Sequence, residues 1–435
     1  MKKLKKKNSK KMLFFILLII KFNSIISLSN PIKLQFSKKT SHPESEYFLI
    51  ERDNEIYTDI EIGTPKIKIS TKISMEYSPF IIRSSIIDGL YNENNSVTFY
   101  KKGDLKTDFY LELFKEGYYS YDKIKFDSNS FDSNLTFILA TKDDLKKKVP
   151  NAFIGLKIED SSFVREQVLI NQLKKNKLIK NNCFFINFDN KNENKGEIII
   201  GNYPHEYDKN YNEKYLHNTK VSDNNNNWKI IIDKVLWKNV SLSKVNQAKF
   251  LLDSGVIFGT DQLKEEIEVF FYQYQSICQL KIYYKDSHIY FVCNKDFDIK
   301  TFPEISFYSK DLNYTFILNY NDLFIKKEDF YYLLIVFGDY QNDIWILGKP
   351  FLKKYNIIFD IDKKVVSYYS ENAIKGKGSK ILIWLIIFIL AFIIGSLGYL
   401  IYKKYNFHRK KRINEIVDEF DYTPQVNRDN NYLNI

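Results

Sequence analysis

The sequence predicts a protein made mainly of β-strands in two similar lobes, with one membrane-spanning helix near its C-terminus. Aromatic residues make up 16% of its 435 residues, enough to fill large cores between many strands. One pattern occurs twice: a strand ending at a polar turn is followed, roughly 80 to 95 residues later, by a strand ending in two apolar residues and glycine. Residues 381–402 are almost entirely apolar, which predicts the helix.

The N-terminal region is typical of a protein that enters the secretory pathway. A lysine-rich start is followed by an apolar run at residues 12–20 and by small residues around Ser27. This order predicts a signal peptide over residues 1–29, because the apolar run is too short to span a membrane comfortably. A short polar lead follows over residues 30–51.

Alternating apolar and polar residues predict the strands of the folded body. Residues 57–65 alternate in this way and end in a turn. The other predicted elements are strands at 66–69, 109–113, 124–126, 135–139 and 196–201, a helix at 163–173 and the first strand of the second half at 228–232. We therefore assign the N-terminal lobe to residues 52–225 and the C-terminal lobe to residues 226–370.

A buried strand in the second lobe ends in Asp253-Ser254-Gly255, before a helix predicted to open at Thr260 or Asp261. A carboxylate at such a place is costly unless a turn and hydrogen bonds receive it. The same tripeptide also occurs in ordinary turns. The tripeptide becomes informative together with a second motif almost a hundred residues later. This motif is Ile346-Leu347-Gly348, followed by Phe351-Leu352-Lys353-Lys354-Tyr355.

Together these motifs resemble the C-terminal lobe of pepsin-like aspartic proteases, where the Asp-Thr/Ser-Gly turn is crossed by an apolar-apolar-glycine strand. In that family the Phe-Leu-Lys-Lys-Tyr helix leads into a strand reading Phe-Asp, which is here Phe359-Asp360. Ile62-Gly63-Thr64-Pro65 is similar to the hairpin that opens the family's first lobe. The resemblance covers residues 57–369 and implies a bilobal all-β pepsin-like fold, with residues 30–51 as a shortened remnant of a prosegment.

Within the family, the chain is similar to membrane-anchored plasmepsins in two features. The similarity lies in the C-terminal apolar segment and in Lys326-Lys327-Glu328-Asp329-Phe330 before a late strand. The endoplasmic-reticulum enzyme of this type is rich in cysteine, whereas this chain has three cysteines, which is a departure from that subfamily.

The first active-site motif departs from the family pattern. Proteolysis in this family needs two carboxylates that share one proton, because like charges so close together cannot both ionise. An ungapped count from Pro65 puts Ser74 at the position of the first aspartate, with Met75, Glu76 and Tyr77 in place of Thr, Gly and Ser. A hydroxyl cannot hold the shared proton, so Asp253 is expected to be alone. Glu76, two residues on and predicted on the same side of the strand, is a candidate substitute.

Other cleft residues follow from the same resemblance. Tyr110 aligns with the flap tyrosine, although leucines replace two flap glycines, and an ordinary sheet tyrosine is the alternative reading. Ser254 and Gly255 would flank Asp253 in the cleft. Cys278 and Cys293 fall where the family often carries a disulfide, and two unpaired thiols are the alternative. No ligand spacing accompanies the cysteines or the five histidines, so neither a metal nor a cofactor is expected.

The C-terminal apolar segment predicts the topology. Residues 381–402 are long enough for a hydrocarbon core of roughly 30 Å. More Lys and Arg residues follow this segment than precede it, so the positive-inside rule places residues 403–435 in the cytoplasm and the body in the lumen or outside. The prediction is a single-pass type I membrane protein of the endoplasmic reticulum, the Golgi or vesicles, or the cell surface. Basic clusters at the termini account for much of the net charge of +12, so nucleic acid is not expected as a partner.

Three functions remain open from the sequence. The first is a degenerate aspartic protease whose cleft binds a peptide or protein, which follows from Ser74 and the altered flap. The second is an active aspartic endopeptidase in which Glu76, or another carboxylate, completes the pair with Asp253. The third is an adhesion or structural ectodomain with an empty cleft. We favour the first, which a lone Asp253 facing Ser74 would support.

Overall fold

A computed structural model of the chain divides it into two compact units, residues 1–370 and residues 371–435. The structure describes residues 31–38, 55–105, 114–126, 132–143, 150–158, 167–189, 192, 195–222, 227–242, 247–283, 288–338, 344–370 and 377–420. The predicted signal peptide, the predicted flap residue Tyr110 and the predicted strand at 109–113 lie outside these residues.

The largest sheet of the first unit has 13 strands in the order β11-β26-β25-β9-β10-β1-β2-β3-β8-β4-β7-β6-β5. Its strands in chain order are β1 (Ile32–Lys38), β2 (Ile56–Ile62), β3 (Ile67–Ser74), β4 (Phe80–Arg83), β5 (Tyr100–Leu105), β6 (Phe114–Lys125), β7 (Ser133–Asp143), β8 (Ala152–Gly155), β9 (Cys183–Phe188), β10 (Lys195–Ile200), β11 (Leu216–Lys220), β25 (Ile358–Asp360) and β26 (Val365–Tyr369). The sheet therefore combines the early strands of the chain with its last two.

Three smaller sheets are built entirely from residues after 228. The first contains β12 (Lys229–Ile231), β15 (Gln247–Phe250), β24 (Trp345–Leu347), β16 (Ile257–Phe258) and β23 (Ile335–Val336). The second contains β14 (Val240–Ser241), β13 (Lys234–Trp237), β19 (Ile305–Ser309) and β20 (Tyr314–Leu318). The third contains β17 (Cys278–Tyr283), β18 (His288–Asn294), β22 (Phe330–Leu333) and β21 (Phe324–Lys327).

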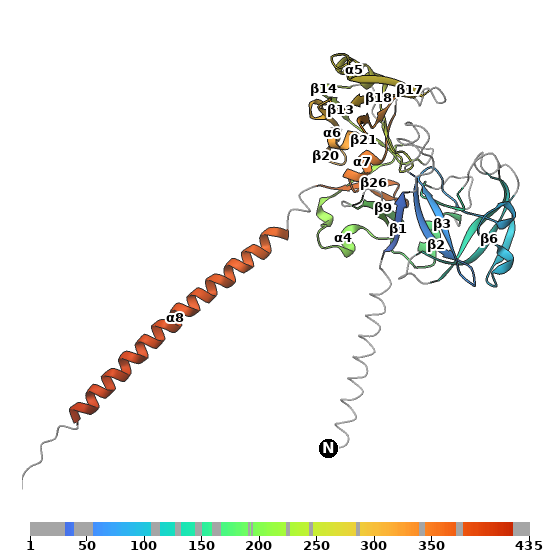
Figure 1. Cartoon of the computed structure of the whole chain (residues 1–435). Coiled ribbons are helices and arrows are strands. Elements are labelled where there is room, and N and C mark those ends of the chain that lie inside the picture. The colour runs from blue at the N-terminus through green and yellow to red at the C-terminus, as the bar shows by residue number, and fades with distance from the viewer. Residues whose placement is uncertain are drawn as a thin grey trace, which may run out of the picture. The chain divides into compact units, whose positions relative to one another are not determined.

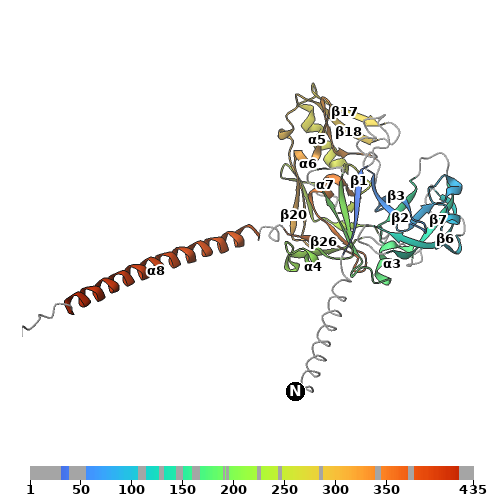
Figure 2. The ribbon, with the colours of Figure 1, turned by 60° about the horizontal axis from the view of Figure 1, so that its bottom comes forward.

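Short helices connect these strands. They are α3 (Leu169–Lys175), α4 (Pro204–Tyr207), α5 (Asp261–Tyr272), α6 (Tyr320–Leu323) and α7 (Lys349–Lys354), with 3₁₀ turns at Ser85–Ile87, Glu93–Asn95, Glu213–Tyr215 and Ile299–Thr301. Both ribbon views show β2, β3 and β6 on one side of this unit and α5, β17 and β18 on the other (Figure 1, Figure 2). The described helices thus lie among strands, as expected for a mainly β protein.

Local sequence explains the elements nearest the site. The alternation predicted from residue 57 appears as β2, in which Ile56, Ile60 and Ile62 are buried and Asp59 is exposed. The helix predicted at Thr260 or Asp261 is α5, and the Thr260 hydroxyl caps it by accepting a hydrogen bond from the Leu263 N–H at 3.4 Å. The helix predicted at 163–173 is α3, which begins at Leu169; residues 159–166 lie outside the described part of the chain.

Residues 32–38, within the predicted lead, form a strand of the main sheet. The strand β1 pairs with both β10 and β2, and Ile32, Leu34 and Phe36 are buried. Their alternation with Lys33 and Gln35 is the period of two that a half-buried strand requires. This alternation is visible in the sequence, but the polar residues around it led us to predict a polar lead instead of a strand.

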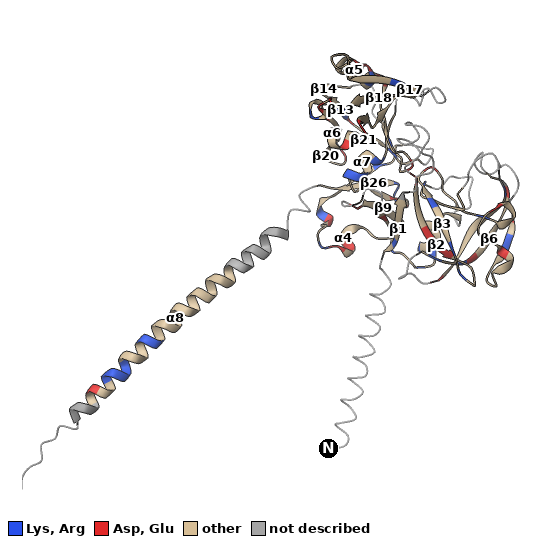
Figure 3. Ribbon diagram, in the orientation of Figure 1, with Lys and Arg blue, Asp and Glu red and all other residues tan. Residues whose placement is uncertain are grey.

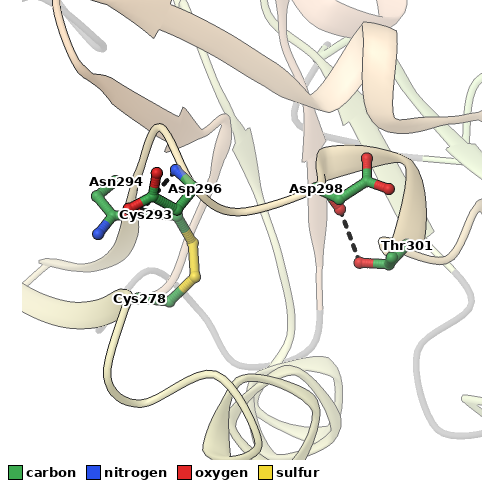
Figure 4. Close-up of a disulfide and its surroundings, with 6 residues drawn as sticks. All are labelled: Cys278, Cys293, Asn294, Asp296, Asp298 and Thr301. Carbon is green, nitrogen blue, oxygen red and sulfur yellow. Dashed lines mark hydrogen bonds between the residues drawn. A yellow bond between two sulfur atoms is a disulfide. The ribbon is translucent and has the colours of Figure 1, made fainter.

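A disulfide joins the first two strands of the third small sheet. Cys278 begins β17 and lies opposite Cys293 of β18, and the two sulfur atoms are bonded (Figure 4). Beyond Cys293 the chain turns through Asn294 and Asp296, where the Asp296 N–H donates to the Asn294 side chain at 2.9 Å. Cys183 is a buried free thiol.

The second unit contains one long helix, α8 (Lys377–Phe420). Within the side chains that the structure describes, Ile387–Ile416 contains a stretch with a mean hydropathy of 1.6 and could cross a membrane by length and composition. Lys and Arg residues gather toward the C-terminal end of this helix (Figure 3). An apolar helix near the C-terminus is thus present where the sequence predicted one.

Candidate active site

Asp253 lies in a turn directly after β15. That strand runs parallel to β24, with Phe250 beside Leu347, and the Leu251 N–H donates to the Leu347 carbonyl at 3.1 Å. Leu251 and Leu252 are buried, whereas Asp253 is half-buried. The turn therefore presents the carboxylate at the edge of the core.

Ser254 holds the turn together. Its hydroxyl donates to the Val256 carbonyl at 2.8 Å and accepts from the Val256 N–H at 3.2 Å. Its carbonyl accepts from the Lys349 N–H at 2.9 Å. Gly348, the residue before Lys349, packs so tightly that a Cβ there would overlap the Val256 carbonyl oxygen. These contacts explain why glycine follows Leu347 in the motif.

The first half of the chain contains a strand pair of the same design. The strand β3 runs parallel to β8, with Ser74 beside Gly155. Ser74 is buried, its carbonyl accepts from the Leu156 N–H at 2.8 Å and its hydroxyl accepts from the Glu76 N–H at 3.2 Å. A Cβ on Gly155 would overlap the Tyr77 carbonyl oxygen. Lys72 and Lys249 each lie beside the residue two positions before the glycine of the neighbouring strand, so Glu76, four residues after Lys72, corresponds in register to Asp253, four residues after Lys249.

A hydrogen bond joins the two halves at this point. The Met75 N–H donates to Asp253 Oδ1 at 3.1 Å, although the two residues are 178 positions apart. A second cross-connection nearby is the bond from Trp228 Nε1 to the Leu156 carbonyl at 2.8 Å. The structure therefore brings the end of β3, at Ser74 and Met75, against the turn that carries Asp253.

Glu76 lies two residues beyond the end of β3 at Ser74. Ile81, five residues after Glu76, lies opposite Phe153, just as Phe258, five residues after Asp253, lies opposite Ile346. The Glu76 side chain is 40% exposed, and its Oε1 lies 3.5 Å from Lys249 Nζ. An ion pair this exposed contributes little to stability. The contact directs the Glu76 carboxylate toward a lysine of the strand before Asp253.

Lys72, two residues before Ser74, is a charged group that the sequence analysis missed. Its Nζ lies 2.8 Å from Glu55 Oε1, and the Tyr57 hydroxyl donates to Glu55 Oε2 at 2.6 Å. Burial disfavours the Lys72 ammonium, but the charges of Asp253, Glu55 and Glu76 outweigh burial and raise the pKa of Lys72 above its ordinary value. In the sequence, Lys72 could have been noticed because it precedes Ser74 by two residues, a spacing that places both side chains on the same side of a strand.

The groups around Glu55 favour its charged form. Burial opposes its ionisation, but the Lys72 ammonium, the hydrogen bonds from Lys72 and Tyr57 and the Lys349 charge together hold the pKa of Glu55 below its ordinary value. Among the described residues, no group of three or more His, Cys, Asp or Glu side chains could hold a metal ion. The site is thus a set of ionised side chains around Asp253.

Comparison with known proteins adds one finding. Residues 56–370 match the model of a protein family described as eukaryotic aspartyl protease. The match includes both Ser74 and Asp253. A search of curated proteins found no match to the chain.

Gly348→Ala tests the packing of the Asp253 turn. We expect a loss of about 1–3 kcal/mol in the free energy of unfolding, because an added Cβ overlaps the Val256 carbonyl and forces the backbone to shift. Urea denaturation measures this loss. Gly103→Ala in β5 is the control, since a Cβ at Gly103 meets no atom within 4 Å. An equal loss in both variants would contradict this account of Gly348.

Glu55→Gln tests the ion pair through its pH dependence. Because the pKa of Glu55 is lower in the folded state, its stabilisation is present above the ordinary value of 4.5 and is lost as pH falls through the folded pKa. The variant should lose about 1–3 kcal/mol at pH 7 and progressively less in acid.

Thermal unfolding between pH 3 and 7 measures the difference between Glu55→Gln and the wild type. Glu61→Gln serves as the control, because the Glu61 carboxylate is 46% exposed and 3.8 Å from Lys66. A difference for Glu55→Gln that stays constant with pH would rule out a depressed pKa.

Proposed function

The chain belongs to the eukaryotic aspartyl protease family, and we propose that it is a membrane-anchored member whose cleft binds a peptide or protein and whose catalysis is impaired. The observation that carries this proposal is the bond from the Met75 N–H to Asp253 Oδ1. It supports a site in which the segment containing Ser74 faces Asp253. Without a second carboxylate, the pair that would activate a water molecule in this family is missing.

The bilobal arrangement is part of the proposal. We assign the N-terminal lobe to residues 52–225 and the C-terminal lobe to residues 226–370. Two parallel strand pairs of the same design, β3 with β8 and β15 with β24, support two related halves. Each pair ends at the turn that carries one half of the site, so a peptide in an extended conformation would lie between the lobes, across Ser74 and Asp253.

Membrane anchoring is the second part. The apolar helix, with basic residues toward its C-terminal end, supports a type I topology in which the body is lumenal and residues 403–435 are cytoplasmic. A disulfide between Cys278 and Cys293 is compatible with the oxidising secretory pathway. The signal peptide at residues 1–29 and the similarity to membrane-anchored plasmepsins complete this proposal.

Glu76 gives little support to the alternative of an active endopeptidase. A substitute carboxylate would have to approach Asp253 closely enough for the two to share a proton. Although Glu76 corresponds in register to Asp253, its Oε1 lies 3.5 Å from Lys249 Nζ. We therefore retain the impaired protease as the function that the geometry supports best.

Incubation of the purified protein with a degenerate peptide library at pH 4 to 7 tests this function. We expect retention of a subset of peptides without cleavage, because the general acid–base pair, worth about 10²–10⁴ in rate, is incomplete. Asp253→Ala should leave the absence of cleavage unchanged. Cleavage that pepstatin blocks and Asp253→Ala abolishes would overturn the proposal, and a folded protein that retains no peptide would favour a structural role.

A further inference from the structure

A run of positively charged side chains follows the apolar part of α8. Between Ile387 and Tyr402 the sequence contains no charged residue. Lys403 and Lys404 come next, and a second basic group follows as Arg409-Lys410-Lys411-Arg412. All six side chains are exposed, and they form the blue stretch toward the C-terminal end of α8 in Figure 3. The cations therefore begin directly where the apolar segment ends.

The acidic residues of this region lie farther along the chain. Glu415 is the first of them, and Asp418, Glu419 and Asp421 follow. At a helical rise of about 1.5 Å per residue, Glu415 lies about 20 Å beyond Tyr402, whereas the six cations lie within about 15 Å of it. At physiological ionic strength a surface charge acts over a Debye length of about 8 Å. The order of the charges thus complements a negatively charged surface at the end of the apolar segment.

Helical geometry directs the basic side chains back toward the apolar segment. In α8 the Cα–Cβ bonds tilt toward the N-terminus of the helix, which is the side on which the apolar segment lies. Consecutive residues are spaced by about 100° around the axis, so Arg409-Lys410-Lys411-Arg412 surround the helix on all sides. Long Lys and Arg side chains also extend along apolar surface to place their charged ends at a membrane interface. The headgroups of lipids around the helix are therefore within reach of these cations.

We propose that residues 403–412 of α8 form a binding site for anionic lipid headgroups, such as that of phosphatidylserine, in the cytoplasmic leaflet. The inference rests on the membrane anchoring proposed above and adds a ligand to the anchor. The positive-inside rule concerns the orientation of such a segment during insertion. Lipid binding goes further, because the phosphate and carboxylate groups of the headgroup accept charge-assisted hydrogen bonds from ammonium and guanidinium groups in the inserted protein.

Electron paramagnetic resonance measures this preference. The full-length protein is reconstituted into phosphatidylcholine nanodiscs that contain a trace of spin-labelled phosphatidylserine or spin-labelled phosphatidylcholine, and the spectrum gives the fraction of each label that the protein immobilises. We expect phosphatidylserine to associate about threefold more tightly than phosphatidylcholine, or better, because each Lys or Arg near the bilayer adds attraction for an anionic lipid. In about 1 M salt, where the Debye length is about 3 Å, most of this preference should disappear.

Variants in the helix and in the body locate the binding site. The test variant replaces the second basic group by glutamine: Arg409→Gln, Lys410→Gln, Lys411→Gln and Arg412→Gln. The control removes the same number of charges from exposed lysines of the body: Lys68→Gln, Lys101→Gln, Lys142→Gln and Lys295→Gln. We expect the preference for phosphatidylserine to fall at least twofold in the test variant and to stay unchanged in the control.

Two kinds of failure are distinguishable. An equal preference in the wild type and the test variant, or no preference in the wild type, would overturn the inference and leave the membrane anchoring intact. A protein that stays outside the nanodiscs would instead refute the proposed anchoring, and with it this inference.

Discussion

The hydrogen bond from the Met75 N–H to Asp253 Oδ1 is the constraint on which the site depends. A carboxylate at the edge of a core is costly unless hydrogen bonds and charges receive it. Here one half of the chain supplies the carboxylate and the other supplies the N–H. That N–H is in place because β3 runs beside β8, which ends in Gly155, and because Leu156 joins the core that includes Trp228. The repeated strand pairs therefore create the site by fixing two turns against each other.

The same frame can support different chemistry, depending on a few side chains. Two carboxylates in these turns would share a proton and activate water. Here Asp253 accepts a hydrogen bond from the Met75 N–H, the Ser74 hydroxyl accepts one from the Glu76 N–H, and the Lys72 ammonium binds Glu55. Glu55 makes this arrangement stable, because without it Lys72 would be a partly buried cation with fewer partners.

Much of this could be predicted from the sequence. The turn at Asp253-Ser254-Gly255 and the crossing strand before Gly348 follow from motif spacing, because tight backbone contacts require those residues locally. The ion pair of Lys72 could not be predicted in the same way, since its partner Glu55 comes from before β2. A strand pattern could not predict the direction of the Glu76 side chain either, because β3 ends two residues earlier.

Calorimetric titration of the unmodified protein with pepstatin, at pH 4 to 7, is the most direct test of the central claim. The hydroxyl group at the centre of pepstatin takes the place of the water that a proton-sharing carboxyl pair activates, so tight binding reports such a pair. If no second carboxylate shares a proton with Asp253, we predict micromolar or weaker binding at every pH. Nanomolar binding that strengthens in acid would contradict this account and show that a second carboxylate completes the site.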